Sequence, residues 1–357
     1  MGFSCGFFGL SFKYRAIFFY GVFLTLLLWF TMSKWLDITV QSIPKSLRLA
    51  EEVDTQQYLR VDNVKSKEVP QCPPLSQITD SGQRQCPMLS PYLIGTQKLT
   101  FESSLTLEDV ERKNPKVVKG RCRPEECTPI QRVAILIPFR NREKHLLYLL
   151  QYLHPFLQRQ LLEYGIYIIN QAGTGLFNRA KLLNIGYMEA LKDYSWDCFI
   201  FHDVDLIPEN DFNLYLCDNE PKHLVVGRNS TGYRLRYRGY FGGATALTRD
   251  QFSLVNGFSN KYWGWGGEDD DLMTRVRLQN MRVVRPSLDI ARYTMVFHKR
   301  DSGNEVNPNR MKTLARTEHL WKKDGLNSCT YELLKTEFSP LYINITVNIG
   351  SPEHPLT

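Results

Sequence analysis

The residues best suited to chemistry lie in one short run, Gly-Trp-Gly-Gly-Glu-Asp-Asp-Asp at 264–271. Four consecutive carboxylates repel one another, so folding alone gives little reason to keep them together. Such crowding raises the pKa of at least one carboxylate and makes it a better general base. The glycines supply a hinge and Trp265 supplies a flat ring, which suits a site that holds a polar ring-shaped ligand and removes its proton. A helix N-terminus decorated with acids is the plain alternative, and it explains one or two of the four.

A second acidic signal, Asp203-Val204-Asp205, ends the apolar run 198–202, which is typical of a buried strand. Two aspartates at the carboxyl end of a strand are well placed to bind a divalent cation that carries phosphates. If the strand continues, alternation places both carboxylates on the same side. Solvated loop charge is the competing explanation, but a sheet edge that faces Arg140 and Arg142 favours the metal–nucleotide role.

Alternating strand and helix patterns must position these residues. Apolar runs predict strands at 133–138, 164–171 and 197–203, and helical spacing predicts helices at 145–161 and 178–191. This order implies an α/β fold with a mostly parallel sheet and helices on both faces. Ligands bind such sheets at the carboxyl ends of the strands, where Arg140, Arg142 and the aspartate pair fall. A later helix is predicted from Glu268 to about Asn280, with the acids in its first turn.

Two further groups are less specific. A lone Met and a lone His, such as Met295 and His298, are usually core or surface residues, although thioether and imidazole ligands can complete a metal site led by a carboxylate. Tyr237 and Tyr240 belong to an aromatic run that precedes Gly242-Gly243. Core packing is the ordinary explanation of such a run, whereas carbohydrate sites use flat rings against sugar C–H faces and glycines for close backbone approach.

Composition narrows the class of protein. The chain has 357 residues, 43% hydrophobic and 23% charged, which is ordinary for a globular protein. Its net charge of +7, with acidic clusters in a basic chain, suits an anionic ligand such as a nucleotide diphosphate. Neither zinc-finger spacing nor a basic helix supports nucleic-acid binding. No glycine-rich dinucleotide motif follows the first strand, and no P-loop motif occurs.

The N-terminal region predicts a membrane anchor. Residues 16–33 are uncharged and rich in Phe and Leu, which is enough to span a bilayer. Lys13 and Arg15 precede the span and favour a cytoplasmic N-terminus. A cleaved signal peptide is the alternative, but no small-x-small cleavage site follows. We therefore expect a cytoplasmic tail at 1–15 and an anchor at 16–33, followed by a polar stem that is broken by prolines.

Cysteines and sequons fit a luminal chain. Of the eight cysteines, Cys5 precedes the span, so the luminal remainder is an odd number. No pair has C-x-x-C spacing, which argues against a zinc site. Asn229-Ser230-Thr231 and Asn344-Ile345-Thr346 are glycosylation acceptors if the chain is luminal.

Taken together, these motifs resemble those of the animal β-1,4-galactosyltransferases. The matching stretches are Pro-Phe-Arg-Asn-Arg at 138–142, Phe-Asn-Arg-Ala-Lys-Leu at 177–182, Asp-Val-Asp at 203–205, Tyr-Phe-Gly-Gly at 240–243 and the run at 263–271. The resemblance covers about 86–350, which it implies is the catalytic domain, with a stem at 34–85 before it and a tail at 351–357 after it. It implies the GT-A nucleotide-diphospho-sugar transferase fold in a single-pass type II Golgi membrane enzyme with a luminal catalytic domain. It also implies Mn²⁺ as cofactor and inverting transfer of galactose from UDP-galactose, in β-1,4 linkage, to terminal N-acetylglucosamine of glycoproteins or neolacto-series glycolipids. Residues 228–237 are most like one paralogue.

The resemblance assigns roles residue by residue. It implies that Asp269 is the general base and that Asp205, Met295 and His298 hold the metal. For the nucleotide pocket it implies Pro138, Phe139, Arg140, Arg142, Phe177, Arg179, Asp203, Val204, Asp205, Trp265, Gly266 and Glu268. For the acceptor it implies Tyr237, Tyr240, Gly243, Asp269, Asp270 and Arg310. Trp265 is expected at the tip of a short mobile loop, and 296–315 as a second loop that folds over the donor. The implied disulfides are Cys86–Cys127 and Cys198–Cys217, while the partners of Cys72, Cys122 and Cys329 stay open.

Two departures from the family pattern concern the acceptor. Met311 follows Arg310 where the founding member has Phe, and the arginines at 228, 234 and 236 replace a less basic segment. Both put a response to α-lactalbumin in doubt. The arginines suggest an acidic acceptor such as 6-sulfated N-acetylglucosamine.

Two rival functions come from other classes. A hydrolase with Asp203 as nucleophile and Asp205 as acid shares the aspartate pair but gives the run at 264–271 no role. A catalytically weak galactose- or glycan-binding member of the same fold is expected to lack a metal ligand or the base, and none is missing.

Overall fold

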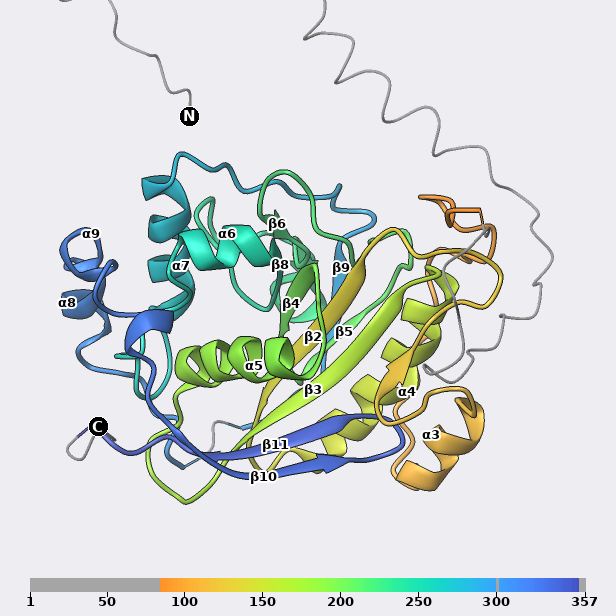
Figure 1. Ribbon diagram of the computed structural model, residues 1–357, viewed down its shortest axis with the longest axis horizontal. Helices are drawn as coiled ribbons and strands as arrows, with labels where there is room; N and C mark the ends of the chain where they lie inside the picture. Colours follow the sequence, from red (N-terminus) through yellow and green to blue (C-terminus); the bar gives the residue numbers. More distant parts are fainter. Residues whose placement is uncertain (1–83, 300–301, 353–357) are drawn as a thin grey trace, which may run out of the picture. The chain divides into compact units, whose positions relative to one another are not determined.

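A computed structural model describes residues 84–299 and 302–352, which are built around an eight-stranded sheet (Figure 1). The strands are β1 (Arg121–Cys122), β2 (Arg132–Phe139), β3 (Glu163–Gln171), β4 (Cys198–His202), β6 (Lys222–His223), β8 (Ala244–Thr248), β10 (Glu332–Phe338) and β11 (Ile343–Asn348). Their order is β10-β11-β3-β2-β4-β8-β6, with β1 on β3. The pairs among β11, β3, β2 and β4 are parallel. The other pairs are antiparallel. The sheet is therefore mixed, and the expected parallel arrangement holds only at its centre.

Both faces of the central strands are buried. On β2, Val133, Ile135 and Ile137 belong to one hydrophobic cluster, whereas Ala134 and Leu136 belong to another. Alternate side chains of a strand point to opposite faces, so a strand buried on both sides needs a continuous apolar run. This is the pattern that predicted the strand.

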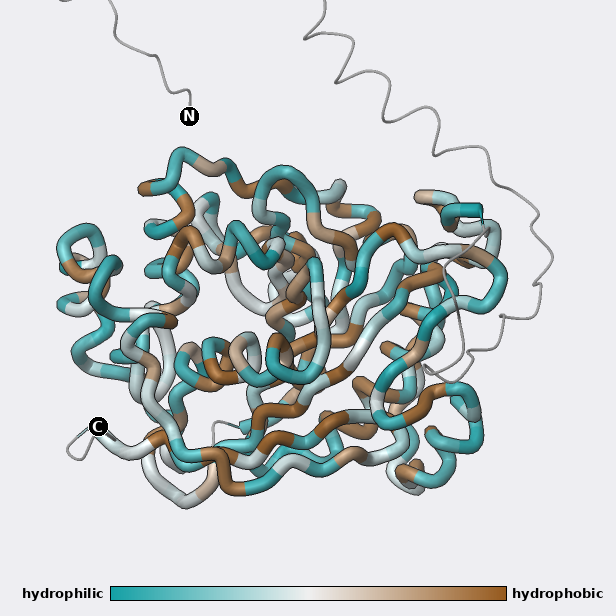
Figure 2. The backbone as a smooth tube through the Cα atoms, in the orientation of Figure 1, coloured by the Kyte–Doolittle hydropathy of each residue, from teal (hydrophilic) through white to brown (hydrophobic). Residues whose placement is uncertain are grey.

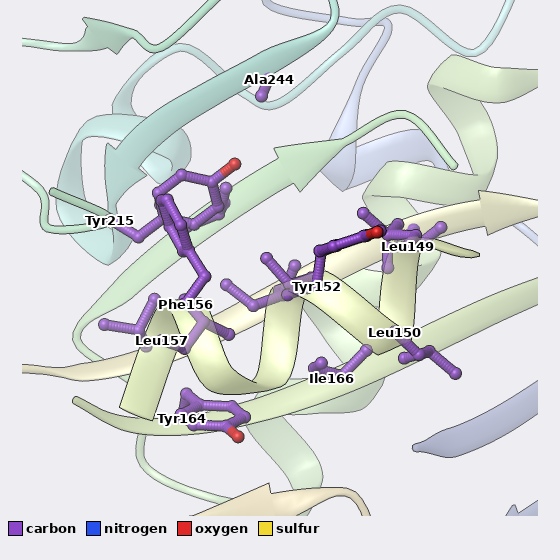
Figure 3. Packing of buried hydrophobic residues seen from close by; sticks show 14 of the residues in the cluster. Leu149, Leu150, Tyr152, Phe156, Leu157, Tyr164, Ile166, Tyr215 and Ala244 are labelled. Atoms are coloured by element: carbon purple, nitrogen blue, oxygen red, sulfur yellow. The ribbon is translucent and has the colours of Figure 1, made fainter. Parts of the chain in front are cut away.

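Two long helices cover the opposite faces of the sheet (Figure 1). Helix α4 (Glu143–Arg159) packs Leu149, Leu150 and Phe156 into the first cluster, near Ile166 of β3 (Figure 3). Helix α5 (Arg179–Asp193) contributes to the second cluster. Figure 2 shows hydrophobic segments along the central strands and on these helices. All five elements predicted between 133 and 203 are present, within two residues at each boundary.

The remaining elements lie around this core. They are α3 (Leu107–Lys113), α6 (Arg249–Leu254), α7 (Glu268–Leu278), α8 (Arg310–Leu314), α9 (Thr317–Leu320) and the short helices η1 (Asn229–Thr231) and η2 (Leu326–Ser328). A small second sheet joins β5 (Leu206–Pro208), β9 (Arg292–Met295) and β7 (Gly227–Arg228). Helix α7 begins at Glu268, as predicted, and ends two residues earlier than expected.

The covalent links agree with the family pattern. Cys86 is bonded to Cys127 and Cys198 to Cys217, while Cys329 is a free cysteine within the described residues. The anchor expected at 16–33 lies outside the described residues. Within 84–299 and 302–352, no helix is long and apolar enough to cross a membrane.

Candidate active site

The site lies where the central strands end. Arg140 follows β2, and Asp203 follows β4. Arg179 is the first residue of α5, and Glu268 is the first residue of α7. Parallel strands bring their carboxyl ends to one edge of the sheet, which is how residues far apart in the chain meet here.

Arg179 joins the two acidic motifs. Its Nε donates to Asp203 Oδ1 at 2.6 Å, and its Nη1 donates to Asp269 Oδ1 at 3.0 Å. The same Nη1 lies 3.7 Å from Glu268 Oε1. Asp203 is thus bound by an arginine at the start of α5, a partner that the motifs did not indicate. Arg140 and Arg142, expected to face the aspartate pair, follow β2 and contact the Gly175 carbonyl and the His298 ring, respectively.

One guanidinium is thus shared by three carboxylates. Burial raises the pKa of Asp269 well above its ordinary value, neighbouring Glu268 and Asp203 raise it further, and Arg179 opposes them. Burial likewise raises the pKa values of Glu268 and Asp203. The direction of the Asp269 shift agrees with the expectation for one carboxylate of the run, but burial is its largest cause and crowding adds to it. Glu268 Oε2 is buried without a hydrogen-bond partner among the described residues.

The other two acids of the run have different partners. Asp270 accepts a hydrogen bond from the Tyr237 hydroxyl at 2.7 Å. Asp271 is buried and accepts from Arg275 Nε at 2.5 Å, from Thr317 Oγ1 at 2.6 Å and from the Tyr262 hydroxyl at 3.1 Å. The acids of the run therefore have different partners: Asp269 binds Arg179, Asp270 binds Tyr237, and Asp271 forms a buried ion pair with Arg275.

Asp203 and Asp205 do not share one side of a continued strand, because β4 ends at His202. Asp205 Oδ2 instead lies 3.1 Å from His298 Nε2. This hydrogen bond raises the pKa of His298 and is the largest cause of the shift, while burial opposes it. Arg142 Nη2 lies 2.7 Å from His298 Nδ1 on the other side of the ring.

The strand pairing of the small sheet brings Met295 next to this pair. Leu206 of β5, which follows Asp205, is the register partner of Met295. The Val296 amide donates to the Asp205 carbonyl at 2.8 Å. A carboxylate oxygen and an imidazole nitrogen that already converge suit a divalent cation, and a nearby thioether can complete the donor set. No cluster of three His, Cys, Asp or Glu residues suited to a metal occurs in the described part of the chain.

Backbone contacts tie the two predicted loops together. The Trp265 amide donates to the Glu305 carbonyl at 2.8 Å, and the Asn307 amide donates to the Trp265 carbonyl at 3.0 Å. Phe177 accepts from the Gly264 amide and donates to the Gly303 carbonyl, both at 2.7 Å. The loop at 302–307 therefore lies against Trp265 and against Phe177, which is expected in the nucleotide pocket.

Arg140 also contacts this region. Its Nη1 donates to the Gly175 carbonyl at 2.6 Å, and its guanidinium lies 5.2 Å from the centre of the Phe177 ring. Arg310 begins α8, and its side chain packs along Gly266, whose φ of 101° favours glycine.

The tyrosines expected to contact the acceptor, Tyr237 and Tyr240, lie on the segment 237–243, which is called the acceptor wall below. Tyr240 is buried, and Tyr237 is 46% exposed. The guanidinium groups of Arg228 and Arg236 lie 5.8 and 5.5 Å from the centre of the Tyr240 ring. The Asp203 amide donates to the Gly243 carbonyl at 2.8 Å, which joins this wall to the metal side.

Other expected residues serve mainly as framework. Pro138 and Phe139 pair with Ile169 and Asn170 of β3, and Val204 packs against the first hydrophobic cluster. Each lies in or beside a strand end and places the neighbouring arginine or aspartate.

Sequence reasoning missed two contacts of the metal-side residues. Asn229 Oδ1 accepts from the Met295 amide at 2.9 Å, and the His145 ring packs edge-to-face on His298 with centroids 5.3 Å apart. His145 lies in the first turn of α4, directly after the Arg140–Arg142 motif, and this position is the signal that could have identified it.

Comparisons with known proteins agree with this architecture. The family model described as the N-terminal region of glycosyl transferase group 7 matches residues 86–218, and the one described as the N-terminal domain of galactosyltransferase matches 222–299. Human β-1,4-galactosyltransferase 4 is 57% identical over 98% of this chain and 98% of its own. Bovine β-1,4-galactosyltransferase 3 is 54% identical over 77% of this chain and 70% of its own. The paralogue indicated by residues 228–237 is the fourth, and these identities agree with that prediction.

Solved structures extend the likeness to the fold. The catalytic domain of Drosophila β1,4-galactosyltransferase 7, in complex with xylobiose, is 28% identical and has a TM-score of 0.53. It covers 61% of this chain and 94% of its own. A variant of that protein, in complex with manganese, UDP-Gal and xylobiose, gives the same values. The fold is therefore the α/β GT-A fold, and the chain belongs to the β-1,4-galactosyltransferases of glycosyl transferase group 7.

Proposed function

We propose that this galactosyltransferase moves galactose from UDP-galactose to the 4-hydroxyl of a terminal N-acetylglucosamine, with inversion and in β-1,4 linkage. The relatives named above support the sugar and the linkage, and the Drosophila complex supports a UDP-Gal donor with a glycan acceptor. The observation that carries the proposal is the Asp203–Arg179–Asp269 bridge. It places a carboxylate of raised pKa beside the residues expected to bind donor and acceptor.

Asp269 is proposed as the general base. It removes the proton from the acceptor 4-hydroxyl while that oxygen attacks the anomeric carbon of galactose. The new carbon–oxygen bond forms on the face opposite the breaking bond to UDP, which leaves as the diphosphate. Arg179 holds the Asp269 carboxylate in place, and the loop at 302–307 excludes water that would otherwise hydrolyse the donor.

Asp205, His298 and Met295 are proposed to hold Mn²⁺. The convergence of Asp205 and His298 supports this, and so does the register of Met295. Bound Mn²⁺ supplies Lewis-acid neutralisation of the leaving diphosphate. Arg142 orients the His298 ring through Nδ1, and Arg140 adds positive charge on the same side.

The direct test is Asp269→Asn in the full chain. We expect transfer to fall by at least about 100-fold, as for loss of a general base, while UDP binding is retained. Asp289→Asn is the matched control, because Asp289 is an exposed aspartate that pairs with Arg292. Wild-type turnover in Asp269→Asn would exclude Asp269 as the base. Absence of transfer by the wild-type protein to any acceptor would favour the glycan-binding alternative.

We also propose an acidic acceptor, such as 6-sulfated N-acetylglucosamine on a glycoprotein or glycolipid. Support comes from Arg228 and Arg236 beside Tyr240, with Arg234 in the same segment. The measurement is the ratio of sulfated to unsulfated activity in Arg234→Ala and Arg236→Ala, and an unchanged ratio would exclude the arginines. Met311 is 63% exposed next to Arg310, and we propose that its replacement of Phe weakens any response to α-lactalbumin.

For the cell, we propose a type II Golgi membrane protein with the boundaries given above and a luminal catalytic domain. The two disulfides support an oxidising compartment. Asn229 is exposed, and Asn344 is half-buried with its amide donating to Glu337 at 3.2 Å. A mobility shift on glycosidase treatment, abolished by replacing both asparagines, tests luminal exposure and glycosylation together.

A further inference from the structure

Two side chains outside the site hold the backbone that carries the acceptor tyrosines. Arg285 Nη2 donates to the carbonyl of Tyr240 at 2.8 Å and to that of Arg238 at 3.3 Å. His223 Nε2 lies 2.9 Å from the carbonyl of Gly242. Arg285 Nε in turn donates to His223 Nδ1 at 3.1 Å. Alternate carbonyls of residues 238–242 are therefore held by one connected pair.

We propose that His223 and Arg285 are positioning residues that set the acceptor wall against Asp269. The inference rests on the proposed function, since it names what fixes the geometry of that site. Neither side chain is expected to touch donor, acceptor or metal.

The contacts fix the tautomer of His223. A guanidinium N–H can only donate, so Nδ1 accepts from Arg285 and the ring proton lies on Nε2, where it is donated to Gly242. His223 is fully buried, and burial lowers its pKa to about 3, which keeps the ring neutral. The His223 ring also packs edge-to-face on Tyr240, with centroids 5.2 Å apart.

Both residues are anchored to the main sheet. His223 belongs to β6, which pairs with β8. Its amide donates to the Val284 carbonyl at 2.9 Å, and the Val284 amide donates to the Pro221 carbonyl at 2.9 Å. Arg285 therefore follows a segment that is hydrogen-bonded to the edge of the sheet. His223 and Arg285 together hold residues 238–242 in a fixed position relative to that sheet.

Gly242 connects this pair to the proposed base. A Cβ at Gly242 would lie 2.0 Å from Asp269 Oδ2 and 2.8 Å from Tyr240 Cε2, so only a backbone without a side chain fits against the carboxylate. The Gly242 backbone therefore lies directly against the Asp269 carboxylate and the Tyr240 ring, so its position bears on the distance between them. Loss of the His223 contact should thus disturb the acceptor wall while leaving the Asp205–His298 pair in place.

Three variants separate the two bonds of His223. In His223→Asn the side-chain oxygen replaces Nδ1 and still accepts the hydrogen bond from Arg285. The hydrogen bond to the Gly242 carbonyl is lost. In His223→Gln the amide nitrogen replaces Nε2 and keeps the bond to Gly242. Arg285→Lys keeps the positive charge, but a lysine ammonium cannot reproduce the guanidinium geometry that donates to both His223 and the Tyr240 carbonyl. The exposed Arg282→Lys is the matched control.

The measurements are KM for acceptor and donor, kcat, donor hydrolysis without acceptor, and equilibrium binding of N-acetylglucosamine to the UDP- and Mn²⁺-loaded protein. We expect His223→Asn and Arg285→Lys to raise acceptor KM and the acceptor dissociation constant by about tenfold, as for a buried carbonyl that loses its donor. His223→Gln keeps the hydrogen bond to the Gly242 carbonyl, so its acceptor KM should lie much nearer the wild-type value than that of His223→Asn. Donor KM and donor hydrolysis should stay within about twofold of wild type, and Arg282→Lys should match wild type.

A parallel loss of donor hydrolysis and transfer, or unchanged acceptor KM in both His223→Asn and Arg285→Lys, would overturn the proposal. Wild-type transfer tests the proposed function separately. The acceptor-binding measurement does not depend on turnover, so it decides on His223 and Arg285 even if galactose is not the sugar transferred. Arg285→Lys is at the surface side of the pair and provides the test if a His223 variant fails to fold.

Discussion

Asp271 offers a sharp test of how the acidic run is divided. Its side chain is 2% exposed, and that of its partner Arg275 is 1% exposed. Asp271→Asn keeps the shape but leaves the Arg275 guanidinium without its closest countercharge. Breaking a buried pair by removing one partner costs about 3–5 kcal/mol, because the remaining charge stays buried. For a domain of this size, that corresponds to a fall in Tm of roughly 6–20 °C.

The assay is thermal and urea unfolding of the wild-type protein and three variants. Asp270→Asn is the matched control, because Asp270 is adjacent and its carboxylate accepts a hydrogen bond from the half-exposed Tyr237; its effect should stay within about 0.5 kcal/mol. Replacing Asp271 by Leu and Arg275 by Met together should recover part of the loss, since neither member of this pair is then left without the other. The recovery should be partial, because the buried Asp324 loses its contact with Arg275 Nη2 at 3.9 Å. A wild-type unfolding midpoint for Asp271→Asn, or an equal loss for Asp270→Asn, would refute this reasoning.

Three further predictions concern the site and its scaffold. Gly242→Ala should lower transfer by at least about 100-fold, because its Cβ would overlap the Asp269 carboxylate, while calorimetry should show normal UDP binding. Because the pKa of Asp269 is raised, its basic form is lost as pH falls through that raised value; the acid limb of kcat/KM should lie above the pH of an ordinary aspartate, and Arg179→Met should move it higher. A pH–rate profile with the limb near pH 4 would contradict this expectation. Replacing Cys198 and Cys217 by Ser opens a loop of sequence separation 19 and should cost about 3 kcal/mol, and an unchanged midpoint in urea would show that the bond does not stabilise the fold.

Periodicity predicted the centre of the fold but not its margins. β2 and β4 are runs that are apolar on both faces, and α4 has a regular apolar stripe, so local pattern was sufficient. β6 has only two residues, and its pairing with β8 is decided by tertiary contacts. The change from parallel to antiparallel pairing beyond β4 depends on chain direction, which residue types do not encode.

The candidate site was also predicted only in part from the sequence. Motifs located Asp203 and Asp269, but they could not say which of several arginines reaches both; Arg179 does so because α5 begins at the carboxyl edge of the sheet. The four acids of the run are alike in type. The one feature of the sequence that distinguishes Asp271 is Arg275, which follows one helical turn later. That spacing could have predicted that Asp271 forms an ion pair within the helix.

The position of β11 has a consequence for how the protein is made. β11 pairs in parallel with β3, with Ile343 opposite Tyr167, although residues 172–342 separate the two strands in the chain. During synthesis β3 therefore emerges long before the strand that covers its edge. Until then its unpaired backbone is a template for pairing with other chains, and loop closure over this distance is slow. The sheet is complete only when this strand has been made, and the exposed edge of β3 makes aggregation during that interval a hazard for the yield of active enzyme.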